Sequence, residues 1–153
     1  MEVYSETDSY VIRKLTKEDF NKGYRELLSD LTKPGSLDER MFETVLSNIG
    51  NSGVCYSIVV IEEKSSGTLI ANGTLVEVAD VYNGGKVTGL IEDIVVLKRA
   101  QGSGYGYKII QTLNDIARSK GCYKVELDCD DSNEGFYRKC GLSKTTMELS
   151  QYF

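Results

Sequence analysis

Hydrophobic residues change their spacing several times along the chain, and each change marks a predicted element. Alternation over Tyr10–Leu15 predicts a first β-strand. Thr16–Asp19 has the composition of a helix start, and the only proline, within Thr32–Gly35, marks the end of that helix. The apolar stripe between them consists of Phe20, Tyr24, Leu27, Leu28 and Leu31.

A second helical stripe follows the proline. Ser36 and Glu39 have the spacing of a capping box, so we expect a helix to start there. Gly50–Gly53 is typical of a turn and ends it. The apolar positions of this helix are Met41, Phe42, Val45, Leu46 and Ile49.

The next segment has the composition of β-strands. Val54–Ile61 and Thr68–Val78 are rich in β-branched residues, and the polar stretch Glu63–Gly67 between them predicts a hairpin. Asn83–Gly85 predicts a second turn, which leads back to a strand beginning near Leu90. These strands form the middle of the expected sheet.

The most informative stretch runs from Ile91 to Gly121. Ile91 and the run Ile94–Leu97 predict a buried strand, and the glycine-rich loop Gln101–Gly106 follows it. A helix comes next, with Ile109, Ile110, Leu113, Ile116 and Ala117 at helical spacing. A glycine loop at a helix N-terminus leaves backbone N–H groups unpaired, and these bind anions such as phosphate. A tight strand-to-helix connection without a ligand is the alternative.

The rest of the chain completes one mixed sheet. Lys120–Gly121 predicts the end of the long helix, and Tyr123–Asp128 alternates like a strand. Ser132 or Asn133 caps a short helix through Phe136, Tyr137 and Cys140, and Leu142–Phe153 predicts a last strand. The expected order is β-α-α-β-β-β-α-β-α-β, a single α/β domain over residues 1–153.

Composition narrows the class of partner. A net charge of −5 argues against nucleic acid, because binding to its backbone needs a basic surface. The apolar runs are far shorter than the ~20 residues of a membrane span. Met1–Ser9 lacks the basic and apolar regions of a signal peptide, so we expect a cytoplasmic protein without a membrane partner.

The chemistry that remains is limited by missing residue types. The chain has four cysteines in no C-x-x-C pair and no histidine, which makes a metal site improbable. Without histidine there is no Ser-His or Cys-His nucleophile pair. The absence of G-x-x-x-x-G-K-[ST] and of G-x-G-x-x-G in the loop also argues against a P-loop or a dinucleotide fingerprint.

The loop reads Q-x-x-G-x-G from Gln101 to Gly106, and it resembles the pyrophosphate loop of the GNAT N-acetyltransferases. Four further motifs in register resemble the glucosamine-6-phosphate N-acetyltransferase family within that superfamily. They are Ile91–Val96, Gly121–Lys124, Asp128–Asp130 and Asn133–Gly141. This resemblance implies the GNAT fold, a homodimer, and transfer of acetyl from acetyl-CoA to the 2-amino group of glucosamine 6-phosphate, on the route to UDP-N-acetylglucosamine.

The resemblance also implies how acetyl-CoA binds. The strand over Glu92–Val96 is expected to separate from its neighbour, so that its backbone groups hold the pantetheine arm and the N–H near Ile94 polarises the thioester carbonyl. Asn133 is either a further contact or a plain helix cap. The residues implied to contact acetyl-CoA are Ile94, Val95, Val96, Gln101, Gly102, Ser103, Gly104, Tyr105, Gly106, Tyr107, Asn133 and Tyr137.

The implied catalytic residues are Tyr137, Asp128 and Ile94. Tyr137 would lie beside the thioester sulfur and stabilise the leaving thiolate by a hydrogen bond; the alternative is a tyrosine packed in the core. Asp128 would accept a proton from the substrate amine or orient it, whereas a lone aspartate at a strand end is often a turn former. A thioester is already activated, so an amine can attack it without a protein nucleophile.

The sugar phosphate requires cations. The resemblance implies Thr32, Lys124 and Lys86 for the phosphate, and Asp128 for the amine. Glu92 and Asp93, at the centre of a strand where burial of a charge is costly, are read as sugar contacts or as a polar dimer contact. The family carries a basic residue near its C-terminus, whereas this sequence reads Ser150–Phe153 there.

Two other functions stay open. The acceptor of the acetyl group could be a polyamine, an antibiotic or a protein amine, which a broad acidic groove would favour. Lys124 and Lys86 lying together would count against that alternative. The protein could also be a non-catalytic acyl-CoA-binding module, for which Asp128 and Tyr137 would have no role.

Overall fold

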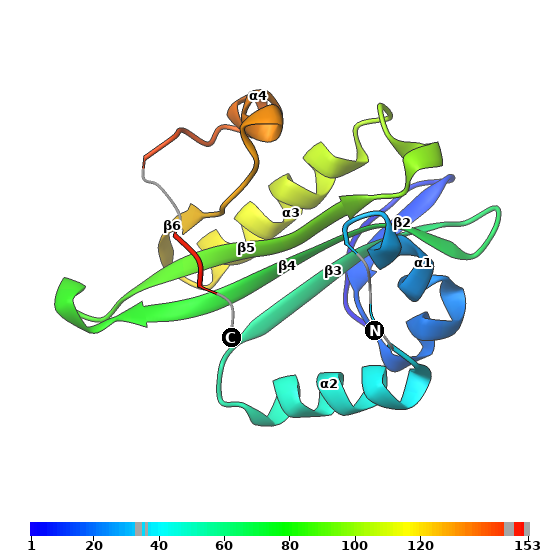
Figure 1. Cartoon of the computed structure of the whole chain (residues 1–153), viewed down its shortest axis with the longest axis horizontal. Helices are drawn as coiled ribbons and strands as arrows, with labels where there is room; N and C mark the ends of the chain where they lie inside the picture. Colours follow the sequence, from blue (N-terminus) through cyan, green and yellow to red (C-terminus); the bar gives the residue numbers. More distant parts are fainter. Residues whose placement is uncertain (33–34, 36, 146–148, 152–153) are drawn as a thin grey trace.

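Six strands form one curved sheet in the order β1–β2–β3–β4–β5–β6 (Figure 1). The computed structural model describes residues 1–32, 35, 37–145 and 149–151. All neighbouring strands are antiparallel except β5 and β6, which are parallel. The strands are β1 Val3–Glu6, β2 Tyr10–Lys14, β3 Tyr56–Glu63, β4 Thr68–Asp80, β5 Lys86–Val96 and β6 Cys122–Glu126.

Helices cover both faces of the sheet. The α-helices are α1 Tyr24–Ser29, α2 Glu39–Asn51, α3 Tyr105–Ser119 and α4 Glu134–Lys139. Short 3₁₀ helices are η1 Lys17–Lys22, η2 Val81–Asn83, η3 Lys98–Ala100 and η4 Asp131–Asn133. None of the helices within the described ranges combines the length and apolar composition that crossing a membrane needs.

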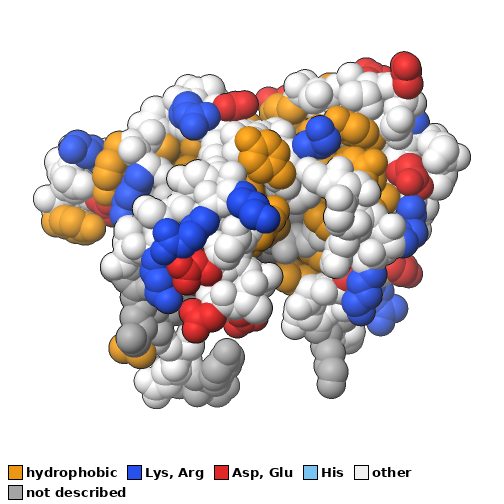
Figure 2. Space-filling view, turned by 90° about the horizontal axis from the view of Figure 1, so that it is seen from above, with side chains coloured by type: hydrophobic (Ala, Val, Ile, Leu, Met, Phe, Trp, Pro, Cys, Tyr) orange, Lys and Arg blue, Asp and Glu red, His pale blue; other side chains and the backbone are white. Residues whose placement is uncertain are grey.

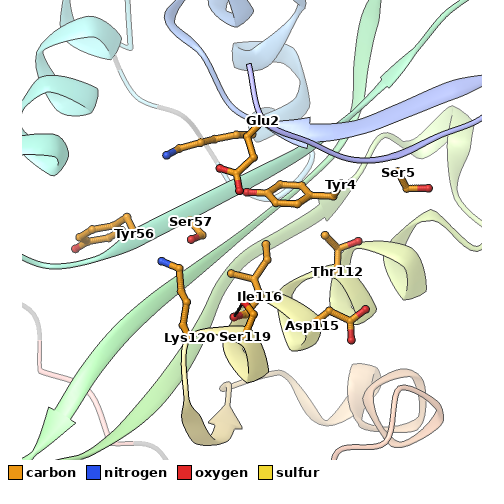
Figure 3. Close-up of a pocket in the computed structure, with 11 residues that line it drawn as sticks. Glu2, Tyr4, Ser5, Tyr56, Ser57, Thr112, Asp115, Ile116, Ser119 and Lys120 are labelled. Carbon is orange, nitrogen blue, oxygen red and sulfur yellow. Dashed lines mark hydrogen bonds between the residues drawn. The ribbon is translucent and has the colours of Figure 1, made fainter.

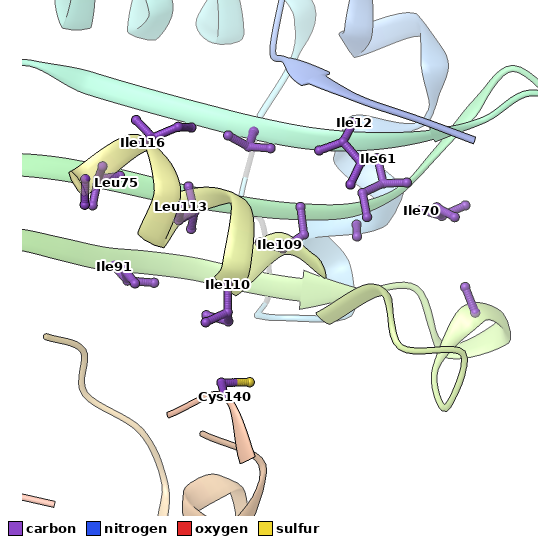
Figure 4. Close-up of a cluster of buried hydrophobic side chains, with 14 residues drawn as sticks. Ile12, Ile61, Ile70, Leu75, Ile91, Ile109, Ile110, Leu113, Ile116 and Cys140 are labelled. Atoms are coloured by element: carbon purple, nitrogen blue, oxygen red, sulfur yellow. The ribbon is translucent and has the colours of Figure 1, made fainter. Parts of the chain in front are cut away.

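The alternation of side chains along the strands creates two cores. In β3, Val59 and Ile61 point to the face covered by α3, and Val60 between them points to the face covered by α1 and α2. Figure 4 shows the α3 side, where Ile109, Ile110 and Leu113 lie against the sheet and are fully buried. The stripe predicted for the long helix is therefore confirmed.

A glycine lets α3 approach the sheet closely. A Cβ atom at Gly73, in the middle of β4, would lie 2.4 Å from Ile109 Cγ2 and 2.7 Å from Ile94 Cδ1. No side chain fits at such distances, so the strand opposite β5 needs glycine here. This close packing brings the start of α3 next to the end of β5.

The N-terminal third differs from the prediction. An additional edge strand, β1, precedes the strand that was predicted as the first. The first helix is divided, because Gly23 takes a left-handed conformation with φ 85° between η1 and α1. The helix α2 is capped by Asp38, whose carboxylate accepts a hydrogen bond from the Met41 backbone N–H. The capping box of Ser36 with Glu39 is therefore wrong; Ser36 itself lies outside the described residues.

Other boundaries also move. The helix α2 continues to Asn51, so the turn expected at Gly50–Gly53 starts later. The strands β4 and β5 extend to Asp80 and from Lys86, which makes the hairpin between them longer than predicted. The last strand, expected over Leu142–Phe153, is absent from residues 142–145 and 149–151, and the remainder of that range lies outside the described residues.

A buried cluster of charges ties β2, η1 and β3 together. Arg13 and Asp19 are only 1% and 0% exposed, and the guanidinium donates to both carboxylate oxygens of Asp19, at 2.8 and 2.6 Å. Arg13 and Lys22 also bind Glu62. Burial alone would raise the pKa of the Asp19 carboxyl, but the hydrogen bonds from Arg13 and from the Thr16 backbone outweigh it and lower that pKa.

We expect Asp19→Asn to reduce the free energy of unfolding by about 3–5 kcal/mol, because it leaves the buried Arg13 charge without its closest partner. The lowered pKa in the folded state means that the wild-type advantage is present above the unfolded pKa of about 3.9 and is lost as pH falls through the folded value. Chemical denaturation at pH 7 and at pH 3 measures both effects.

The control is Asp115→Asn, which removes an exposed ion pair with Arg118 and should cost under about 1 kcal/mol. A loss at Asp19 as small as the loss at Asp115 would contradict the assigned role of the buried pair.

Candidate active site

The strand β5 loses one of its two neighbours halfway along its length. It pairs with β6 from Val87 to Leu90, and β6 ends at Glu126. From Ile91 to Val96, β5 pairs with β4 alone in the described part of the chain. The separation of β5 from β6 predicted for this strand is therefore confirmed within the described residues, and the backbone near Ile94 lies at the edge where an added strand could pair.

A bulge lies in this half of β5, where β4 is its strand neighbour. Thr74 pairs with Glu92 and Asn72 with Val95, so Asp93 and Ile94 together oppose the single residue between them on β4. Asp93 has φ 54°, the only positive φ of a non-glycine residue in the described ranges. Both Glu92 and Asp93 are exposed, so neither charge bears the cost of burial that its place in the strand suggested. Their position beside the separated β6 explains the exposure.

The bulge determines the direction of the Ile94 N–H group. The Asp93 carbonyl oxygen accepts a hydrogen bond at 3.0 Å from the side chain of Asn72, on β4. The described peptide bonds are all trans, so this C=O and the Ile94 N–H point in opposite directions. The Ile94 N–H therefore points away from β4, toward the open edge of β5.

The glycine loop lies between β5 and α3 at the end of this edge. Gly102 and Gly104 have φ 78° and 82°, and Tyr105 begins α3, so the first-turn N–H groups of α3 border the loop. Gln101 is exposed and its side chain donates to the Val96 carbonyl at 3.1 Å. Ser103 is also exposed, as is Tyr107 one turn later. The loop thus has the geometry of an anion site.

The helix α4 packs on this loop through another glycine. A Cβ atom at Gly106 would lie 3.1 Å from Cζ of Phe136, and the Phe136 and Tyr137 rings are 5.0 Å apart. Asn133 occupies the N-cap position of α4, but its side chain makes no capping hydrogen bond. The helix-cap alternative for Asn133 is therefore not supported.

Tyr137 is half-buried beside the hydrophobic core. Burial, followed by the nearby Cys129 and Cys140, raises the pKa of its phenol to about 12. At neutral pH Tyr137 is consequently a hydrogen-bond donor and a very weak acid. Packing in the core and a role at the site are compatible, because only part of the ring is covered.

Asp128 and Cys129 follow β6 and are exposed. The pKa of the Cys129 thiol is raised by burial and by the carboxylates of Glu134, Asp130 and Asp131. A thiol with a raised pKa is a poor nucleophile. The cysteine nearest the candidate site is therefore unsuited to carry an acyl group.

Two of the predicted cations lie at one aromatic ring next to the turn of the β4–β5 hairpin. The Nζ atoms of Lys86 and Lys124 lie 5.4 and 5.7 Å from the centre of the Tyr123 ring. The Tyr123 phenol donates to Asp80 at 3.3 Å and accepts from Asn83 at 3.1 Å. Figure 2 shows basic and hydrophobic side chains side by side at the end of the molecule that this hairpin forms.

Thr32 is not part of this cluster. It follows α1, and its backbone N–H donates to Leu28. No hydrogen bond or ion pair among the described residues joins Thr32 to Lys86 or Lys124.

Sequence reasoning missed Tyr24, Asn72 and Tyr123 as site residues. The one available signal was Asn72, an amide within the otherwise apolar centre of a predicted strand. Its partners Tyr24 and Asp93 are 48 and 21 positions away, so the contact is visible only in the fold.

A cavity of about 490 Å³ lies away from the predicted residues, between β1, β3 and the second half of α3 (Figure 3). Tyr4, Ser57 and Ile116 are among the side chains that line it, together with Asp115 and Lys120. None of the predicted site residues lines this cavity. The open edge of β5 and the glycine loop, rather than this cavity, define the candidate active site.

Comparison with known proteins agrees with this geometry. The model of the acetyltransferase (GNAT) family matches residues 12–142, which include the sheet from β2 onward, the glycine loop and α4. The chain belongs to the GNAT acetyltransferase family. GNAT acetyltransferases use acetyl-CoA as the donor, and the open strand edge and glycine loop fit such a ligand.

Within this family the chain is similar to glucosamine 6-phosphate N-acetyltransferases along nearly its whole length. The Arabidopsis thaliana protein of that name is 42% identical over 147 residues, which cover 95% of this chain and 98% of the relative. The Candida albicans protein is 38% identical over 141 residues, 92% and 93% of the two chains. The crystal structure of the Arabidopsis thaliana enzyme superposes with a TM-score of 0.90, covering 97% and 99% of the two chains at 40% identity. The predicted family and fold are confirmed.

Proposed function

We propose that this protein transfers the acetyl group of acetyl-CoA to the 2-amino group of D-glucosamine 6-phosphate, giving N-acetyl-D-glucosamine 6-phosphate and CoA. The observation that carries the proposal is the open edge of β5 from Ile91 to Val96, which leads to the glycine loop at one end and faces the region after β6. The similarity to named sugar-phosphate acetyltransferases supports this acceptor.

The donor side uses backbone groups. In the proposal, Gln101 to Tyr107 bind the pyrophosphate through the N–H groups at the start of α3. Val95 and Val96 hold the pantetheine arm as an added strand, and Asn133 supplies a side-chain hydrogen bond. The bound donor supplies a thioester, an acyl group that is already activated. The Ile94 N–H points to the open edge and is the proposed donor to its carbonyl oxygen.

Tyr137 stabilises the departing thiolate in this proposal. A pKa of about 12 keeps the phenol protonated, so Tyr137 can donate a hydrogen bond to sulfur. Full proton transfer to a thiolate, whose conjugate acid has a pKa of about 8.5, is strongly uphill. The proposed contribution is therefore a hydrogen bond in the transition state, without general-acid transfer.

Asp128 accepts or orients the proton of the amine on the other side of the reacting centre. It is exposed and follows the end of β6, within reach of a ligand that occupies the space beside β5. Glu92 and Asp93, exposed on the same part of β5, are proposed to contact the sugar hydroxyls.

The pair Lys86 and Lys124 is proposed to bind the phosphate of the sugar. Both ammonium groups lie at the Tyr123 ring, and the proposal is that one anion contacts both. Lys124 also forms an ion pair with Glu126, which the phosphate would have to replace or share. Two lysines close together disfavour a cationic acceptor such as a polyamine. Thr32 stays a weaker candidate because it lies outside this cluster.

We also propose a homodimer. At the tip of the β4–β5 hairpin, Val81 and Tyr82 are 92% and 89% exposed, and the hairpin projects from the body of the molecule (Figure 1). Exposed apolar residues on a projecting hairpin are suited to contact a second copy. Light scattering should give twice the chain mass of 17.0 kDa, and Tyr82→Lys should lower it. A monomeric wild type would contradict this part of the proposal.

The acceptor is tested by measuring CoA release with glucosamine 6-phosphate, glucosamine, galactosamine 6-phosphate and spermidine. We expect kcat/KM for glucosamine 6-phosphate to exceed the others by about a hundredfold, roughly 2.8 kcal/mol. Lys86→Ala and Lys124→Ala should each raise KM for glucosamine 6-phosphate about tenfold and leave the slow reaction of glucosamine unchanged.

Lys17→Ala, which removes a lysine at the start of η1, is the matched control. Preference for spermidine would reject the sugar-phosphate assignment while leaving the family unchanged. Equal effects of the lysine variants on the phosphorylated and unphosphorylated sugars would reject the phosphate site.

The catalytic roles are tested with Tyr137→Phe and Asp128→Asn. We expect each to lower kcat about 10–100-fold while circular dichroism shows an unchanged fold. Because the pKa of Tyr137 is about 12, the phenol stays protonated throughout pH 6–9.5. Tyr137→Phe should therefore lower the rate by the same factor at every pH in that range. A wild-type activity that falls above pH 8 in a way abolished by Tyr137→Phe would contradict this state of the phenol.

A further inference from the structure

A chain of hydrogen bonds leads from the core to the backbone of the proposed oxyanion donor. Asn72, on β4, is fully buried. Its side-chain N–H group donates to the Asp93 carbonyl at 3.0 Å, and its side-chain oxygen accepts from the Tyr24 phenol at 3.3 Å. Tyr24 belongs to α1, so the bulge in β5 is connected to a helix that covers one face of the sheet.

Both hydrogen bonds run in the same direction, from Tyr24 to Asn72 and from Asn72 to the Asp93 carbonyl. The Asp93 carbonyl and the Ile94 N–H belong to the same peptide group, so a hydrogen bond to the carbonyl also fixes where the N–H points. A donor at the carbonyl withdraws electrons from the peptide and makes its N–H a stronger donor. By donating to the Asn72 side-chain oxygen, Tyr24 likewise makes the Asn72 side-chain N–H a stronger donor. Each donor in the series therefore strengthens the next.

The phenol of Tyr24 is held in the donor form. Burial, followed by the charges of Asp93 and Asp19, raises its pKa well above the usual value. Its ring is fixed by packing against Phe42, at a centroid distance of 5.1 Å, and is 7% exposed. The phenol donates its hydrogen bond to Asn72, so the effect inferred for Tyr24 on the Asp93–Ile94 peptide passes through that amide.

The bulge needs such support, because Asp93 is the one described non-glycine residue with positive φ. Thr74 donates a further, longer hydrogen bond of 3.4 Å to the Asp93 carboxylate. Asn72 and Thr74 flank Gly73, the residue opposite the bulge. Asn72 and Thr74, both on β4, therefore bind the carbonyl and the carboxylate of Asp93.

We propose that Tyr24 and Asn72 are positioning residues that orient and polarise the Asp93–Ile94 peptide, so that the Ile94 N–H stabilises the developing oxyanion of the acetyl donor. This inference rests on the proposed acetyl transfer, but it does not depend on which amine is the acceptor. It predicts an effect on the acetyl carbonyl and none on the binding of the CoA portion.

Tyr24→Phe is the most direct test, because it removes one oxygen and keeps the packed ring. We expect kcat to fall about tenfold, KM for acetyl-CoA and for the acceptor to change less than threefold, and the dissociation constant of CoA to stay within twofold. Tyr4→Phe is the matched control: Tyr4 is a partly buried tyrosine on β1, away from β5. We expect its kcat to equal that of the wild type.

Asn72→Asp adds a test with a distinct pH signature. A protonated carboxyl group can still donate to the Asp93 carbonyl and accept from Tyr24, whereas a carboxylate repels that carbonyl. Burial disfavours the charged form, so this carboxyl should titrate above its usual value. The ratio of variant to wild-type kcat should therefore rise as pH is lowered from 8 to 6.

The spectroscopic readout separates positioning from a structural role. The infrared stretching frequency of [1-¹³C]acetyl-CoA bound without acceptor should be lower on the wild type than in water, and this shift should be smaller on Tyr24→Phe. A merely structural change would alter the melting temperature and leave the bound frequency unchanged. Equal kcat and an equal carbonyl frequency in Tyr24→Phe and the wild type would overturn the inference.

Failure of the proposed function gives a different result. If the wild type acetylates spermidine and not glucosamine 6-phosphate, the acceptor assignment is rejected, and the effect of Tyr24→Phe is measured with spermidine. If the wild type acetylates no amine, the carbonyl frequency of bound acetyl-CoA alone tests the inference, because that measurement requires no acceptor.

Discussion

Backbone hydrogen bonding determines where this protein can bind a ligand. Each strand in the middle of a sheet needs a neighbour on both sides, and within the described residues β5 has two only as far as Leu90. β6 ends at Glu126 and the chain continues into η4 and α4, so β6 does not cover the second half of β5. A polar edge of this kind is costly unless water or a ligand occupies it. The glycine loop, α4 and Asp128 all surround the same stretch.

The sequence predicts a large part of this arrangement because the relevant signals are local. The period of two in β3 and β4, the stripe of α3 and the glycine loop lie within short windows. The loop's motif and the later Asn133–Gly141 segment are specific enough to indicate the family. The edge strand β1 escapes prediction because four residues with a mostly exposed pattern carry almost no periodic signal.

Contacts between distant positions could not be predicted. The Asn72 side chain donates to the Asp93 carbonyl on the neighbouring strand, and Lys86 and Lys124 both lie at the ring of Tyr123 on β6. The bulge at Asp93 arises because β5 has one residue more than β4 between two paired positions. The sequence of one strand does not reveal this difference. The buried pair of Arg13 with Asp19, which holds η1 against β2, likewise joins residues that no short window of sequence links.

The contact between Gly106 and Phe136 has a consequence for the length of the acyl carrier. An aromatic ring rests against a residue with no side chain, so the ring lies close to the backbone of α3. The neighbouring Tyr137 is thereby kept at a constant separation from the first turn of α3. In the proposed complex, one end of the carrier binds at that turn and its sulfur lies at Tyr137. The protein can therefore select acyl carriers by the distance between their phosphate and their sulfur. A carrier with a shorter arm would place its acyl group short of the Ile94 N–H.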